Sequence, residues 1–228
     1  MKIRAIVTDI EGTTSSIDFV HKVLFPYAAK ALPEFVRSSH GHPEIAALLD
    51  EVRAEAKEFD ASIERLIEIL LCWIDEDRKA TSLKTLQGHI WRHGYENGDF
   101  TGHIYDDAAD RLRRWSKMDI ELYVYSSGSV VAQKLLFGHS DAGDLRPLFK
   151  GYFDTRIGHK KDVQSYENII VAIRIPADEV LFLSDVAEEL DAAAAAGMLT
   201  TQLVRLDDVI VGQHPVATNF NEVKIAGH

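Results

Sequence analysis

Short apolar runs are spread unevenly along this chain. The run Ile3–Val7 turns polar at Thr8-Asp9, which is typical of a buried strand whose end carries polar side chains. Comparable runs return only in the second half of the chain. They are Ile120–Tyr125, Gly151–Asp154, Val180–Leu183 and Thr200–Val204, and we predict that each forms a strand.

Helical periodicity fills most of the sequence between the first two predicted strands. Its clearest stretch is Ile63–Ile74, where apolar side chains recur at i, i+3, i+4 and i+7. Pro26 and Pro33 interrupt the segment from Phe19 to Val36, which predicts two short helices or one kinked helix. Further helices are predicted at residues 45–52, 81–95, 108–115, 130–137, 165–173 and 188–196.

The alternation of strands with helices after the first hundred residues indicates βαβ units and a parallel sheet. One strand precedes the long helical stretch, and the other strands follow it. We therefore expect a doubly wound α/β core formed by residues 1–18 and 104–228. A helical cap, residues 19–103, would be inserted after the first strand.

Charge and cysteine content narrow the functional classes. The 228 residues include 25 Lys and Arg against 36 Asp and Glu, a formal net charge of −11. This surplus argues against nucleic-acid and anionic-membrane partners, which require clustered positive side chains. A single cysteine, Cys72, excludes an internal disulfide and a cysteine-rich zinc site. The first apolar run ends too early for a signal peptide, so we expect a cytoplasmic protein.

The ends of the predicted strands carry the candidate chemistry. In open α/β sheets, ligands bind outside the carboxyl ends of the strands. Two of these ends are acidic, one is rich in hydroxyl groups, and a lysine pair lies in a nearby loop. The residues are Asp9 and Glu11, Ser126 and Ser127, Lys160 and Lys161, and Asp185 with Glu188 and Glu189.

Carboxylates gathered at one edge would repel one another, and a hard dication would offset that repulsion. Mg²⁺ prefers carboxylate and water oxygens and leaves coordination positions open for a substrate phosphate. The serines and Lys160 would donate hydrogen bonds to phosphate oxygens. Asp9 would then accept the phosphoryl group, because a carboxylate can form an aspartyl-phosphate intermediate.

These motifs resemble the four signatures of the haloacid dehalogenase superfamily. Asp9–Thr13 matches the first signature, Ser126 the second, Lys160 the third and Ser184-Asp185 the fourth. More narrowly, the chain is similar to the enolase-phosphatases of methionine salvage over residues 3–204. The further matching stretches are Leu86–Trp91, Tyr125–Ser140, Gly151–Thr155 and Ile157–Lys160.

The resemblance implies a Rossmann-like core with a helical cap, one Mg²⁺ per chain and a monomer. It also implies a two-step reaction on a small phosphorylated diketone, 2,3-diketo-5-methylthiopentyl-1-phosphate. Enolisation followed by phosphate hydrolysis gives the acireductone 1,2-dihydroxy-3-keto-5-methylthiopentene.

By the same resemblance, three residues would be Mg²⁺ ligands, with Asp9 also the nucleophile: Asp9, Glu11 and Asp185. Glu11 stands where the superfamily mostly has Asp, and it would act through its side chain or its backbone carbonyl. It is also a candidate proton donor to the leaving oxygen. Ser126, Ser127 and Lys160 would bind substrate, and Glu189 is a candidate for ordering a metal-bound water.

Two other functions are compatible with the same strand ends. A phosphatase for another small phosphate ester would need the same core residues, since they determine phosphoryl transfer and not the substrate. A receiver-like signalling module would also combine a strand-end aspartate with Mg²⁺. The long helical insertion favours an enzyme, because a lid that excludes water serves turnover.

Overall fold

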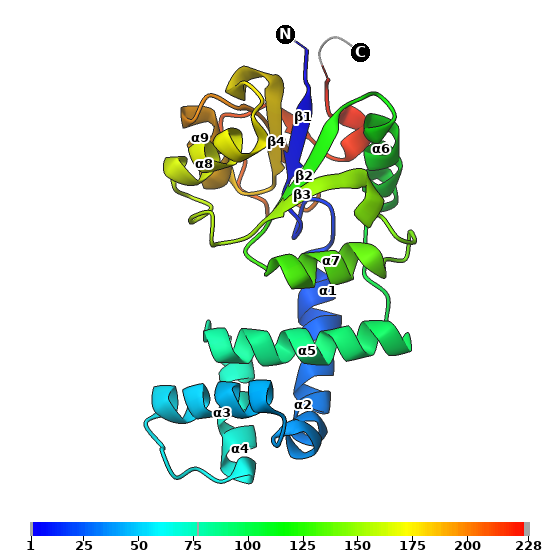
Figure 1. Cartoon of the computed structure of the whole chain (residues 1–228). Helices are drawn as coiled ribbons and strands as arrows, with labels where there is room; N and C mark the ends of the chain where they lie inside the picture. The colour runs from blue at the N-terminus through cyan, green and yellow to red at the C-terminus, as the bar shows by residue number, and fades with distance from the viewer. Residues whose placement is uncertain (1, 77, 226–228) are drawn as a thin grey trace. The chain divides into compact units, whose positions relative to one another are not determined.

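A computed structural model describes residues 2–76 and 78–225 of the chain. Its backbone contacts divide the chain into two compact units. Met1–Ile17 and Thr101–His228 form one unit, which contains the sheet, and Asp18–Phe100 forms the other, which is helical (Figure 1). The helical unit is thus inserted into the sheet unit between its first and second strands.

The sheet has six strands in the order β3-β2-β1-β4-β5-β6, and every neighbouring pair is parallel. The strands are β1 (Ala5–Thr8), β2 (Glu121–Tyr125), β3 (Phe149–Phe153), β4 (Val180–Ser184), β5 (Leu199–Leu203) and β6 (Val216–Ala217). Thr8 at the end of β1 pairs with Val124 on one side and Leu183 on the other. This arrangement confirms the parallel α/β architecture and puts β1 in the interior of the sheet.

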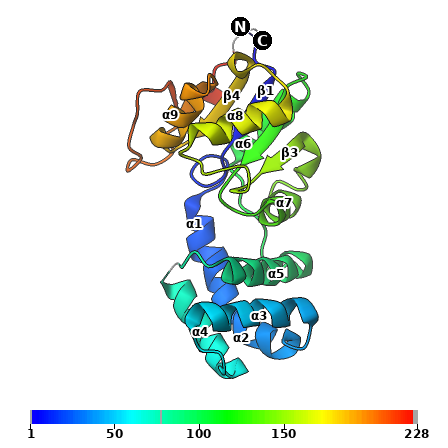
Figure 2. The same ribbon diagram turned by 60° about the vertical axis from the view of Figure 1, so that its left-hand side comes forward.

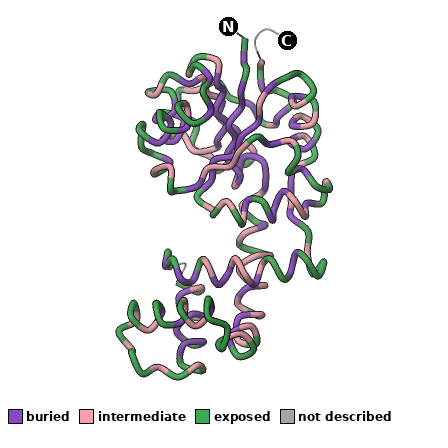
Figure 3. The backbone as a smooth tube through the Cα atoms, in the orientation of Figure 1, coloured by how far each residue is buried: buried purple, intermediate pink, exposed green. Residues whose placement is uncertain are grey.

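Helices cover both faces of this sheet. The helix α6 (Asp106–Ser116) lies on one face, and α8 (Val163–Ile173) and α9 (Ala187–Ala195) lie on the other (Figures 1 and 2). The remaining elements of this unit are α7 (Val130–Gly138), η2 (Arg146–Leu148), η3 (Ala177–Glu179) and η4 (Phe220–Glu222). The strands β1 and β4 are buried throughout, as Figure 3 shows in purple, which explains why their sequences are unbroken apolar runs.

The prediction that Thr200–Val204 is the final strand was wrong, because β6 follows it. This strand has two residues and pairs with the end of β5 through Gln202–Val216 and Leu203–Ala217. A strand of two residues is too short to show an alternating pattern in the sequence.

The helical unit has a hydrophobic core of its own, built from buried side chains such as Leu32, Leu49, Leu70 and Leu86. Its elements are α1 (Ile17–Phe19), the π-helix η1 (Val20–Leu24), α2 (Phe25–Ser39), α3 (Pro43–Ala56), α4 (Ile63–Asp75) and α5 (Thr81–Asn97). No helix in residues 2–76 and 78–225 is long and apolar enough to cross a membrane.

The prolines interrupt this unit differently from the expectation. Pro26 lies in the first turn of α2, and Leu24 before it already has helical backbone angles, so the helical chain runs through this proline. Pro33 lies inside α2, which continues to Ser39. The change in helix type comes earlier, in the π-helical segment Val20–Leu24.

Candidate active site

Three of the predicted site residues follow neighbouring strands at the same edge of the sheet. Asp9 comes directly after β1, Ser126 after β2 and Asp185 after β4. Because β2 and β4 flank β1, Asp9 lies between the other two positions. The backbone N–H of Asp9 donates to Leu183 O at 2.8 Å, which extends the pairing with β4 up to the aspartate itself.

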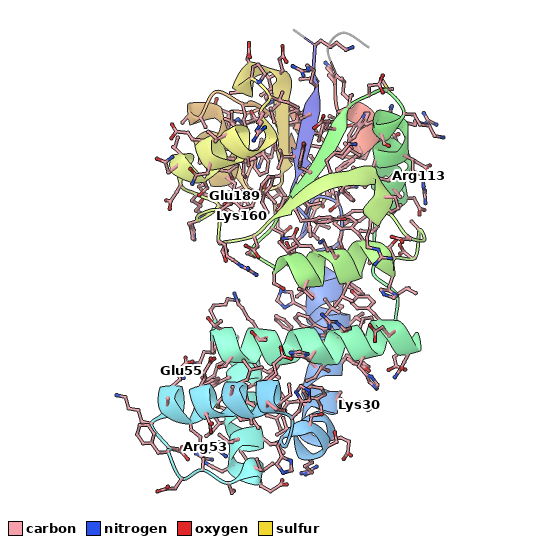
Figure 4. All side chains as sticks on the ribbon, viewed as in Figure 1. Lys30, Arg53, Glu55, Arg113, Lys160 and Glu189 are labelled. Atoms are coloured by element: carbon pink, nitrogen blue, oxygen red, sulfur yellow. The ribbon has the colours of Figure 1, made fainter. Side chains whose placement is uncertain are left out.

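Lys160 joins Asp9 to Glu189. Its ammonium nitrogen lies 2.6 Å from Asp9 Oδ1 and 2.7 Å from Glu189 Oε2, and all three side chains are at least 90% buried. Figure 4 labels Lys160 and Glu189 next to each other beside the sheet. Glu189 Oε2 also accepts a hydrogen bond of 2.9 Å from the Ser184 hydroxyl. The carboxylate that the sequence associates with a metal-bound water is therefore held by Lys160 and Ser184.

The charges around Lys160 shift the ionisation of the whole cluster. Burial by itself would lower the pKa of Lys160, but the charges of Asp9 and Glu189 outweigh burial and raise it. Burial and the charge of Asp9 raise the pKa of Glu189 to about 7. The same two causes raise the pKa of Asp185 to about 6. Asp9 therefore lies close enough to both carboxyl groups to act on them electrostatically.

Hydrogen bonds from α8 hold the loop that carries Lys160. The Tyr166 hydroxyl donates to Lys160 O at 2.6 Å, and the Ser165 hydroxyl donates to His159 O at 2.7 Å. Gly158 has φ +140°, and a Cβ there would lie 2.1 Å from the Ser165 hydroxyl oxygen. The glycine and the two hydroxyl groups of α8 thus allow the lysine to enter the site from a short loop.

Ser126 contacts Glu11. The Ser126 hydroxyl oxygen lies 3.3 Å from Glu11 Oε2, and it also accepts a hydrogen bond of 3.0 Å from Gly128 N. Burial, followed by the charge of Asp9, raises the pKa of Glu11. Ser126 is buried, whereas Ser127 is exposed at the sheet edge. The two serines thus differ in accessibility although they are adjacent in sequence.

The turn after Asp9 passes directly against Asp185. Gly12 has φ +73°, and a Cβ at this position would lie 2.2 Å from Asp185 Oδ2. The Thr13 hydroxyl oxygen is 3.4 Å from Asp185 Oδ1. Thr14 donates its hydroxyl hydrogen to Asp9 O at 3.0 Å. A glycine is therefore required here by both the backbone conformation and the neighbouring carboxylate.

The residues present fit a hard cation. Among the described residues, the Lys160 ammonium pairs with Asp9 and Glu189 and acts electrostatically on two further carboxyl groups, those of Glu11 and Asp185. Asp9 Oδ1 is buried and makes an ion pair, but within the described residues it accepts no hydrogen bond of regular geometry. Such an excess of oxygen ligands over positive charge suits Mg²⁺. In the described part of the chain, however, no three His, Cys, Asp or Glu side chains gather closely enough to form a ready-made metal site.

The Glu11 carboxylate contacts the Ser126 hydroxyl, with Oε2 at 3.3 Å from Oγ. The carboxylates of Asp9 and Asp185 could be supplemented by an oxygen of Glu11 and by water, which Mg²⁺ commonly retains.

Sequence reasoning missed two residues that support the site. Arg205 follows β5 and donates its Nε hydrogen to Thr13 O at 2.7 Å. Gln202 lies within β5, and its amide nitrogen donates to Asp185 O at 2.8 Å. The signal that could have found Arg205 is its position just after a strand's carboxyl end, as for the other site residues.

Comparisons with known proteins agree with this geometry. Residues 3–197 match the family model described as haloacid dehalogenase-like hydrolase. A protein of Pseudomonas aeruginosa named Enolase-phosphatase E1 is 57% identical over 225 residues, covering 99% of this chain and 100% of the relative. A protein of the same name from Erwinia tasmaniensis is 55% identical over 221 residues, covering 97% and 96%. The UTR4 protein of Saccharomyces cerevisiae superimposes with a TM-score of 0.84 at 36% identity, covering 97% of this chain and 100% of that structure.

Proposed function

Because this chain belongs to the haloacid dehalogenase-like hydrolases, as an enolase-phosphatase of that family, we propose that Asp9 is its phosphoryl acceptor and that its substrate is a small phosphorylated diketone. The substrate would be 2,3-diketo-5-methylthiopentyl-1-phosphate of methionine salvage. The observation that carries the proposal is the buried pair of Lys160 with Asp9, at the end of an interior strand.

One Asp9 carboxylate oxygen attacks phosphorus, and the bond from phosphorus to the substrate oxygen breaks with its electron pair on that oxygen. Glu11, whose pKa is raised by burial, donates a proton to the leaving oxygen. Water then attacks the aspartyl phosphate, which releases phosphate and restores Asp9.

Phosphate binding falls to Lys160 and to the Ser126–Ser127 segment. The charge on Lys160 persists at neutral pH, because Asp9 and Glu189 raise its pKa. An ammonium at this place neutralises charge on the phosphoryl group during transfer. Ser127, which is exposed, would donate to the outer phosphate oxygens, and the buried Ser126 contacts Glu11.

Mg²⁺ is the cofactor we propose, held by Asp9, Asp185 and the Glu11 backbone or side chain. When bound, it would offset the negative charge of the carboxylates and of the transferred phosphoryl group. Support comes from the carboxylates that share one ammonium and from the buried Asp9 oxygen. One ion per chain and a monomeric, cytoplasmic enzyme complete the proposal.

The decisive experiment supplies the diketo phosphate with Mg²⁺ and follows enol absorbance and inorganic phosphate together. Both signals should appear with the wild-type protein and disappear with chelator, and phosphate release should disappear in Asp9→Asn. Asp110→Asn is the matched control, because Asp110 is exposed on α6 and changing it should leave both signals intact.

Two outcomes would contradict the proposal. Phosphate release without an enol intermediate would identify a phosphatase for another ester. A phosphoenzyme that survives for hours, rather than decaying in seconds, would identify a receiver-like module.

A further inference from the structure

Arg205 is enclosed by the segments around the candidate site. Only 7% of its side chain is exposed. Its guanidinium carbon lies 3.9 Å from the centre of the Tyr105 ring and 5.4 Å from that of Phe220. Its terminal nitrogens contact the two Asp107 carboxylate oxygens at 3.1 and 2.8 Å. The position of this guanidinium is therefore fixed by two rings and a two-pronged ion pair.

The third guanidinium nitrogen, Nε, points away from Asp107 toward the turn that follows Asp9. Arg205 Nε donates to Thr13 O at 2.7 Å, and the neighbouring carbonyl of Thr14 accepts from Tyr105 N at 3.0 Å. The turn from Gly12 to Thr14 is thus anchored through its backbone to Arg205 and to the residue that stacks on it.

The Gly12–Thr14 turn also contacts the Asp185 side chain. Gly12 lies so close to this side chain that an added Cβ would be 2.2 Å from Asp185 Oδ2, and the Thr13 hydroxyl is 3.4 Å from Oδ1. A shift of the turn toward or away from β4 would therefore move the Asp185 carboxylate or release it. The position of the turn therefore bears on the orientation of the carboxylate, both through the close approach of Gly12 and through the Thr13 hydroxyl.

We propose that Arg205 is a positioning residue that fixes the Asp185 carboxylate for cation binding by anchoring the Gly12–Thr14 turn. This inference rests on the proposed Mg²⁺ site, since Asp185 is one of its ligands. In this role Arg205 would not itself be a ligand of the cation. It acts through Thr13, as residues that hold metal ligands in place commonly act through a hydrogen bond.

Lysine cannot replace arginine in this role. A guanidinium contacts Asp107 with two nitrogens and Thr13 with a third, whereas a single ammonium at the end of a flexible chain cannot reach both partners in the same geometry. Arg205→Lys therefore keeps the charge near Asp107 and loosens the turn. This distinguishes the positioning of the turn from simple charge balance.

The test is the affinity of the full-length chain for Mg²⁺ alone, measured by titration calorimetry without substrate. We expect Arg205→Lys to weaken Mg²⁺ binding by about tenfold or more, the usual effect of losing a residue that orients a metal ligand. With diketo phosphate present, the Mg²⁺ concentration for half-activation should rise by the same factor. Turnover at saturating Mg²⁺ should stay close to that of the wild type.

Phe137→Leu is the control for a general loss of stability. Phe137 is fully buried in α7 and packs on Phe149, with ring centres 4.6 Å apart. It should lower thermal stability without changing the Mg²⁺ affinity. If Arg205→Lys fails to fold, Asp107→Glu serves as the second variant, because one added methylene pushes the guanidinium away from Thr13. It should weaken Mg²⁺ binding in the same direction.

Unchanged Mg²⁺ affinity in Arg205→Lys, with reduced stability alone, would overturn the inference. An absence of Mg²⁺ binding by the wild type would also overturn it. A wild type that binds Mg²⁺ but does not turn over the diketo phosphate would contradict the proposed function and leave the positioning role standing.

Discussion

The Lys160 ammonium and the Asp9 carboxylate face each other at 2.6 Å, with 10% and 3% of the two side chains exposed. The lysine also contacts Glu189, so one cation separates two buried carboxylates. Such an arrangement positions a nucleophile and a phosphate-binding charge together. It also makes the protein sensitive to loss of the cation, because the remaining charges would be buried without compensation.

Lys160→Met should therefore lower the free energy of unfolding by roughly 3–5 kcal/mol and abolish phosphate release. Denaturant titration in the presence of chelator measures the first effect. Lys161→Met is the matched control, since Lys161 is 51% exposed and its contact with Glu188 is a surface pair. Its effect should stay below about 1 kcal/mol. Equal effects of the two substitutions would contradict a special role for Lys160.

Gly12→Ala should destabilise the protein by about 1–3 kcal/mol and abolish turnover, because it adds backbone strain and a clash with Asp185. Gly98→Ala separates the two effects. Gly98 has a similar φ of +76°, but nothing lies within 4 Å of an added Cβ. It should cost only the backbone strain, about 1 kcal/mol, with turnover retained. Loss of turnover in both variants would exclude the clash as the cause.

Ser126→Ala should reduce kcat/KM by about 2–10-fold, the effect of removing a hydrogen bond between neutral groups, because Glu11 is protonated when it acts as proton donor. Steady-state kinetics with the diketo phosphate measures this change. Ser129→Ala is the control from the same loop. Ser129 accepts from Ala132 N at 3.2 Å as the N-cap of α7, so its loss should cost about 1 kcal/mol of stability and leave kcat/KM unchanged.

Asp107 should contribute to acid unfolding. Burial alone would raise its pKa, but hydrogen bonds from Arg205 and from Phe220 N outweigh burial and hold its pKa below the ordinary value of 3.8. The Asp107 carboxylate thus binds a proton less readily in the folded protein than in the unfolded chain. The stabilisation is present above about pH 4 and is lost as pH falls through the lowered pKa.

Asp107→Asn should accordingly lower stability at neutral pH and make the decline of stability below about pH 4 shallower. Denaturant midpoints measured at several pH values provide the test. Asp110→Asn, an exposed change on the same helix, should leave the slope as in the wild type. A steeper acid decline in Asp107→Asn would contradict the assignment.

The main elements of the fold could be predicted because their sequences are simple. Buried strands such as β1 and β4 are unbroken apolar runs between polar ends, and α4 repeats its apolar positions at helical spacing. The two-residue β6 and the π-helical segment Val20–Leu24 have no such signature. Local sequence pattern therefore predicts neither element.

Within the candidate site, sequence pattern identified the side chains at strand ends but not their partners. The sequence around Glu189 does not indicate its pairing with Lys160, because the two residues lie in different parts of the chain. Arg205 is a single arginine whose partners Thr13 and Asp107 are 192 and 98 positions away in the chain. Contacts of that separation exist only after the sheet has formed, so no local pattern encodes them.

The strand order also determines when the site can form during synthesis. β1 leaves the ribosome first, yet it pairs with β2 at Glu121 and with β4 at Val180. The inserted helical unit has its own core, and its folding would shorten the loop that β1 must close. Asp9 is thus translated before β4 and the Lys160 loop. Its contacts with Leu183 and Lys160 can form only after those segments have been synthesised.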